Sequence, residues 1–76
     1  METITQKEIA ISLRVNNTTV GLALARVPRV AQEANAYLYD RDTAREAVIR
    51  YFEDLHEKHQ RKAERYAEMI EKARKL

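Results

Sequence analysis

Few side chains in this sequence could carry covalent or metal chemistry. The 76 residues include no Cys, one Ser (Ser12) and two His, so thiol catalysis, a disulfide framework and a Cys-ligated zinc site are excluded. His56 and His59 stand three residues apart with Glu53 or Glu57 nearby, and could ligate one ion from one helix face. Since only two or three ligands are available there, we expect no metal site, no cofactor and no catalysis.

Hydrogen-bonding side chains are instead grouped at residues 16–19, where the sequence is Asn-Asn-Thr-Thr. Amide and hydroxyl side chains are preferred at helix N-caps, because their oxygens accept hydrogen bonds from the unpaired backbone N–H groups of the first turn. The same groups can contact a ligand when that first turn points outward. We therefore expect this run to begin a helix and to offer a contact surface.

The elements expected around this run are a helix at residues 6–13 and a second helix at residues 17–26, with a tight turn at Val15. Each helix places its apolar side chains on one face, so the two should cross through a small contact. The residues expected in that contact are Ile9, Ala10, Leu13, Val20 and Leu24. This is the helix-turn-helix pattern, in which the second helix lies in the major groove of DNA.

The chain then changes character at Pro28, its only proline. Proline disfavours helix at the residue before it, so the second helix should end just upstream. Strands are predicted near residues 28–30 and 36–39, and residues 31–36 could form either a hairpin tip or a helical turn. Residues 41–74 contain neither Gly nor Pro and are rich in helix formers, which predicts one long C-terminal helix.

The apolar pattern divides this long helix after residue 55. Upstream of that point the apolar stripe is dense and should dock on a core, whereas beyond it the stripe thins to a heptad-like spacing. Because so small a domain could not bury a helix of this length, we expect residues 1–55 to form the domain and residues 56–76 to be a self-associating extension. The residues expected in that self-association are Tyr66, Met69, Ile70 and Ala73.

The charge balance identifies no partner by itself. The formal net charge is +2, although residues 58–76 carry seven basic and three acidic side chains, and such cations are favoured near a helix C-terminus without any ligand. The longest apolar stretch, residues 20–25, is far shorter than the roughly 20 residues that span a membrane. We expect a soluble, cytoplasmic protein.

Several short motifs follow one another over residues 4–55. They are Thr5-Gln6-Lys7-Glu8-Ile9-Ala10 with Leu13 and Val15, then Thr19-Val20, Val27-Pro28-Arg29-Val30, Ala36-Tyr37-Leu38-Tyr39-Asp40 and the run 43–52. In this order they resemble the winged helix-turn-helix domains shared by MerR-type regulators, phage excisionases and the DNA-recognition domain of lambda-type small terminase subunits. The resemblance implies a mostly α fold with a small two-stranded wing and a long C-terminal helix.

The resemblance also implies sequence-specific binding of duplex DNA, with the helix at residues 17–26 in the major groove. The expected base contacts are Asn17, Thr18 and Leu22, and the expected phosphate contacts are Lys7, Arg14, Thr19, Arg26 and Arg29. The family often has Gly in the turn where this chain has Arg14, and a left-handed backbone there would cost about 1 kcal/mol.

The protein would then be a small phage- or plasmid-type regulator or a packaging-site recognition domain, serving transcription control, excision or packaging. One such domain buries too little surface for high specificity, so two copies or repeated sites would be required.

Other interpretations stay open. Ile9, Ile11, Leu13 and Val15 alternate with small or polar residues, a strand pattern that would make the protein a ribbon-helix-helix repressor paired with a second copy. Residues 5–33 can also be compared with the headpiece of lactose-repressor-type regulators. From a different class, the chain could be a helical adaptor that contacts only protein.

Overall fold

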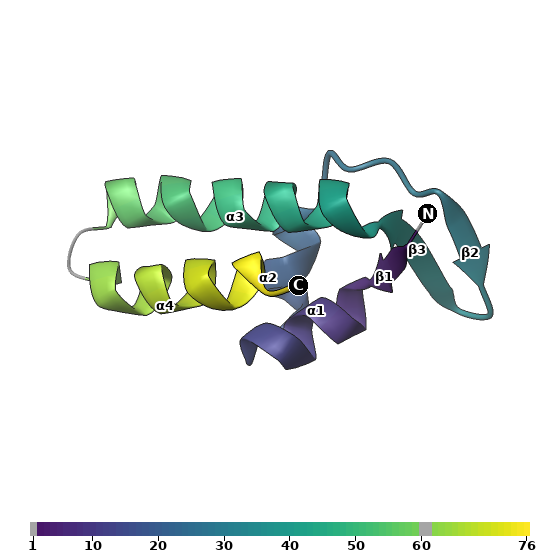
Figure 1. Ribbon diagram of the computed structural model, residues 1–76, viewed down its shortest axis with the longest axis horizontal. Coiled ribbons are helices and arrows are strands. Elements are labelled where there is room, and N and C mark those ends of the chain that lie inside the picture. Colours follow the sequence, from purple (N-terminus) through teal and green to yellow (C-terminus); the bar gives the residue numbers. More distant parts are fainter. Residues whose placement is uncertain (1, 60–61) are drawn as a thin grey trace.

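The computed structural model describes residues 2–59 and 62–76 and is mostly helical, with four helices and one antiparallel sheet in that part of the chain (Figure 1). The elements in order are β1 (Thr3–Thr5), α1 (Gln6–Leu13), α2 (Asn17–Ala23), β2 (Ala31–Glu33), β3 (Ala36–Asp40), α3 (Arg41–Lys58) and α4 (Ala63–Arg74). The predicted mixture of helices with a small sheet is confirmed. Within these residues no helix has both the length and the apolar character needed to cross a membrane.

The sheet has three strands where two were predicted, in the order β1-β3-β2. The additional strand, β1, pairs with β3 and places Ile4 opposite Tyr39, and both side chains are buried. The strand predicted near 28–30 begins later, at Ala31, and its ladder is preceded by a hydrogen bond from Val30 N to Leu38 O. Pro28 has no N–H to donate to a ladder, which explains the later start.

Residues 31–36 form a hairpin and not a helical turn. β2 pairs with β3 so that Glu33 lies opposite Ala36, and the two residues between them make the turn. Ala34 has a left-handed backbone with φ of 52°, a conformation that hairpin turns usually give to Gly or Asn. The neighbouring Asn35 does not have a left-handed backbone.

Helices α1 and α2 form the predicted crossing pair. Ile9, Leu13, Val20 and Leu24 are at most 3% exposed and belong to the core cluster. Since residues 9–13 are helical, the strand interpretation behind the ribbon-helix-helix alternative is wrong. The second helix is shorter than predicted, because α2 ends at Ala23 and the chain turns over residues 24–26.

The prediction of one helix over residues 41–74 is also wrong. α3 ends at Lys58, α4 begins at Ala63, and the two lie side by side in Figure 1. α4 also contacts α1. The reversal buries apolar side chains that a straight helix would expose, and local helix propensity is outweighed by such burial. The buried residues near the end of the chain are Met69, Ile70, Ala73 and Leu76.

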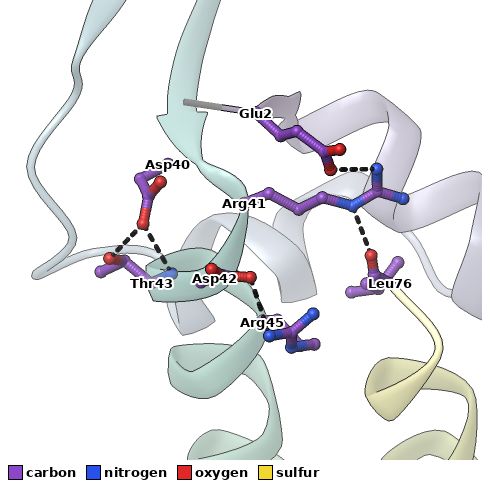
Figure 2. Close-up of polar contacts among 7 residues, drawn as sticks. All are labelled: Glu2, Asp40, Arg41, Asp42, Thr43, Arg45 and Leu76. Carbon is purple, nitrogen blue, oxygen red and sulfur yellow. Dashed lines mark hydrogen bonds and ion pairs between the residues drawn. The ribbon is translucent and has the colours of Figure 1, made fainter.

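Arg41 connects the two ends of the described chain at the start of α3. Its Nε donates a hydrogen bond to the backbone carbonyl of Leu76, and its guanidinium forms an ion pair with Glu2 at 3.1 Å (Figure 2). The preceding residue, Asp40, caps α3 by accepting hydrogen bonds from the backbone N–H and the hydroxyl of Thr43. These contacts anchor β3, α3 and α4 to one another.

Candidate nucleic-acid interface

The start of α2 divides its polar side chains into a cap and an exposed pair. Asn16 is the N-cap, and its Oδ1 accepts hydrogen bonds from the backbone N–H of Thr19 at 3.0 Å and from the Thr19 hydroxyl at 3.2 Å. The Thr19 hydroxyl, a predicted phosphate contact, therefore donates its proton within the protein. Asn17 and Thr18 are exposed, and their side chains make no hydrogen bond within the described residues. They are available to an external partner.

The first turn of α2 is attached to α1 by Gln6. Its Nε2 donates a hydrogen bond of 2.7 Å to the backbone carbonyl of Asn17. Gly21 allows this close approach, since a Cβ at that position would lie 3.1 Å from the same Nε2. Gln6 was not among the predicted site residues. The one feature of the sequence that could have indicated this contact is Gly21, which lies in the second helix on the side that faces the first helix.

Leu22 gives the outward side of α2 an apolar character. It is 63% exposed, and lies one turn after Thr18 on the same face of the helix. The three predicted base contacts, Asn17, Thr18 and Leu22, thus all lie on one short helix with exposed side chains. Such a surface offers one amide, one hydroxyl and one aliphatic group to a partner.

The four charged residues among the predicted phosphate contacts flank this helix in the chain. Lys7 lies on α1, Arg14 is the C-cap of α1, Arg26 is in the turn after α2 and Arg29 precedes β2. All four side chains are exposed, and none forms an ion pair with a described residue, whereas ion pairs are found at Arg41, Arg45 and Arg74. The backbone of Arg14 is left-handed, with φ of 56°, a conformation that favours glycine and costs other residues about 1 kcal/mol.

Within the part of the chain that the structure describes, Arg29 is the one of these four cations that packs on an aromatic ring. Its guanidinium carbon lies 3.6 Å from the centroid of the Tyr37 ring, on strand β3. Tyr37 is itself 40% exposed. Sequence reasoning identified Arg29 but did not associate it with Tyr37, because the two residues are brought together only by the pairing of β2 with β3.

An open groove runs beside α2. It lies between α2 with its following turn and helix α3, and has a volume of about 600 Å³. Its lining combines apolar side chains with charged ones, which are Arg26, Arg50, Lys58 and Asp54. Leu22 belongs both to this groove and to the outward face of α2, so the two surfaces are continuous.

The residues predicted for self-association lie mostly inside the molecule. Met69, Ile70 and Ala73 are at most 9% exposed, and the ring of Tyr66 lies 6.3 Å from that of Phe52. They pack within one chain against the same cluster as Ile9. Self-association through these residues stays a prediction, and would require α4 to leave its place.

Comparisons with protein-family models, with curated proteins and with solved structures find no match to this chain.

Proposed function

We propose that this protein binds duplex DNA through α1 and α2. The proposal rests on one observation at the start of α2: Asn16 caps the helix, and the side chains of Asn17 and Thr18 are therefore left exposed to solvent. In helix-turn-helix proteins the first residues of the second helix contact base edges. Asn can pair bidentately with adenine, and Thr and Leu can contact the methyl group of thymine, so these residue types fit that role.

The unpaired cations supply the electrostatic part of the proposal. Phosphates on either side of the DNA major groove would be contacted by Lys7, Arg14, Arg26 and Arg29. The β2–β3 hairpin would serve as the wing. Each phosphate contact contributes about −0.9 to the slope of log K against log salt, so four contacts predict a slope of about −4. A net charge of only +2 is compatible with this, because the cations are local to the site.

The process that such binding would serve is regulation of transcription, excision or recognition of a packaging site in a small phage- or plasmid-type system. One copy of so small a unit recognises a short sequence, and two copies on neighbouring half-sites would give the specificity that these processes need.

Binding-site selection from a pool of random duplexes, carried out at two salt concentrations, tests the proposal. We expect an enriched sequence motif at both concentrations and weaker binding at the higher one. Recovery of no enriched motif, together with no measurable binding at low salt, would contradict DNA recognition.

A second candidate function is docking of a protein partner, and the exposure of Leu22 beside the groove between α2 and α3 favours it. The dependence of partner binding on salt separates the two functions. Phosphate contacts weaken steeply as salt rises, whereas apolar association does not.

A further inference from the structure

We infer that Tyr37 is a positioning residue, which holds the guanidinium of Arg29 in place for a phosphate of the DNA backbone. The inference rests on the proposed DNA binding and specifies the contact made by the hairpin. Nothing in the residue pattern connects the two side chains, since Arg29 lies in the loop before β2 and Tyr37 lies on β3.

The first step is the geometry of the pair. The guanidinium carbon of Arg29 lies over the Tyr37 ring at 3.6 Å from its centroid, within the range of cation–π attraction. A cation–π contact uses no N–H donor, and no hydrogen bond or ion pair from Arg29 is found among the described residues, so its N–H groups are open to the bidentate binding of a phosphate.

The second step is the contrast with the other arginines that make contacts. Arg41, Arg45 and Arg74 are held by carboxylates, at 3.1, 2.8 and 2.7 Å. A carboxylate fixes an arginine but also occupies its donors and neutralises its charge. Tyr37 instead fixes Arg29 while keeping both its donors and its charge available to an anion.

The third step is the rigidity of the backbone on either side. Arg29 follows Pro28, whose φ is fixed, and precedes Val30, whose N–H donates to Leu38 O at 2.9 Å. Tyr37 lies in the paired part of β3, opposite Gln32. Both members of the pair are therefore attached to ordered backbone, so a phosphate contact by Arg29 would lose less side-chain entropy than one made by a mobile arginine.

The experiment measures affinity for a pool of random-sequence duplexes of about 20 base pairs, two helical turns, as a function of salt. The proteins are the full chain, Arg29→Ala, Tyr37→Leu, Tyr37→Phe and the double variant Arg29→Ala/Tyr37→Leu. Thermal unfolding of each variant shows that the fold is retained.

We expect Arg29→Ala to reduce the salt slope by about 1. Tyr37→Leu should weaken binding roughly two- to five-fold, in line with an exposed cation–π contact. Tyr37→Phe should bind like the full chain, because it keeps the ring and loses only the hydroxyl. In the Arg29→Ala background, Tyr37→Leu should have no further effect.

Three results would overturn the inference while leaving DNA binding intact. The first is an equal loss of DNA affinity from Tyr37→Leu with and without Arg29, which would mean that Tyr37 acts on the DNA directly. The second is the same loss of affinity from Tyr37→Phe as from Tyr37→Leu. The third is an unchanged affinity in Tyr37→Leu. Absence of salt-dependent binding by the full chain would instead overturn the proposed function, and the inference with it.

Discussion

The side-chain amide of Gln6 donates a hydrogen bond of 2.7 Å to the backbone carbonyl of Asn17, and so joins the first turn of α1 to the first turn of α2. The two helices are otherwise held by apolar contacts, which are not directional. Burial of Val20 and Leu24 decides which side of α2 faces α1, and the Gln6 hydrogen bond adds a directional contact at the end of α2 where Asn17 and Thr18 lie.

Replacing Gln6 by Ala should lower the free energy of unfolding by about 1 kcal/mol, the usual net value of such a hydrogen bond. It should also weaken DNA binding, because the first turn of α2 loses its polar attachment to α1. Urea unfolding and a binding titration measure the two effects. Gln32→Ala, at an exposed site on β2, is the control for the stability measurement alone and should change stability by less than about 0.5 kcal/mol. Equal effects from the two substitutions would show that the Gln6 contact has no role.

Asn16 and Asn17 are adjacent residues of the same type with different expected roles. Asn16→Ala removes the cap of α2 and should destabilise the protein by about 1 kcal/mol. Asn17→Ala combined with Thr18→Ala should leave stability near that of the full chain and abolish the sequence preference found by binding-site selection. An unchanged preference in that double variant would place the base contacts on another surface.

Ala34 has an unfavourable left-handed backbone in the hairpin turn, with φ of 52°. Ala34→Gly should raise the free energy of unfolding by about 0.5–1 kcal/mol, because glycine has no Cβ to clash in this conformation. Ala36→Gly, in the neighbouring strand, should lower it by a similar amount. Chemical denaturation of both variants checks the signs. Destabilisation by Ala34→Gly would mean that the turn does not adopt this geometry in solution.

Ile70 and Ile11 offer a matched pair of isoleucines with opposite exposure. Ile70 is 9% exposed and packs in the core, whereas Ile11 is 66% exposed. Ile70→Ala should cost about 2–4 kcal/mol, and Ile11→Ala less than about 0.5 kcal/mol. Amide hydrogen exchange at Ile9 and Leu13 should speed up in Ile70→Ala, since α1 and α4 share the core. Unchanged exchange there would show that α4 folds separately.

The cap of α3 predicts a pH dependence. Hydrogen bonds from the Thr43 hydroxyl and then from its backbone N–H lower the pKa of Asp40 below its usual value. Because the folded pKa lies below the unfolded one, the unfolded state binds more protons between the two values. The stabilisation is therefore complete above the unfolded pKa, near pH 4, and is lost as pH falls through the lowered pKa.

Thermal unfolding between about pH 2 and pH 6 measures this effect, since the Asp reference pKa lies near 3.9. Asp40→Asn keeps a good capping side chain that cannot ionise, so its melting temperature should fall less steeply with acid than that of the full chain. Asp54→Asn, on the exposed part of α3, should retain the full chain's slope. Identical acid profiles for all three proteins would contradict the role of Asp40.

Local patterns in the sequence were sufficient to predict the elements whose cores are formed by near neighbours. The helix at residues 6–13 has the predicted bounds, and the crossing of α1 and α2 follows from Ile9, Leu13, Val20 and Leu24. The exposure of Asn17 and Thr18 likewise follows from the cap beside them. These features depend on contacts within about 20 residues.

The features that were missed depend on distant contacts. Strand β1 has only three residues, too few for a periodic signal, and its partner Tyr39 lies far along the chain. The division between α3 and α4 has no proline or glycine to mark it, because the reversal is stabilised by the burial of Met69 and Ile70. The stacking of Arg29 on Tyr37 requires the hairpin register.

The contact between α1 and α4 has a consequence for synthesis on the ribosome. A nascent chain that has emerged only as far as α3 lacks the side chains that cover α1, so it cannot complete its core. Folding is therefore expected to finish only after α4 has left the exit tunnel. Chains that stop before α4 would expose apolar surface to chaperones and proteases.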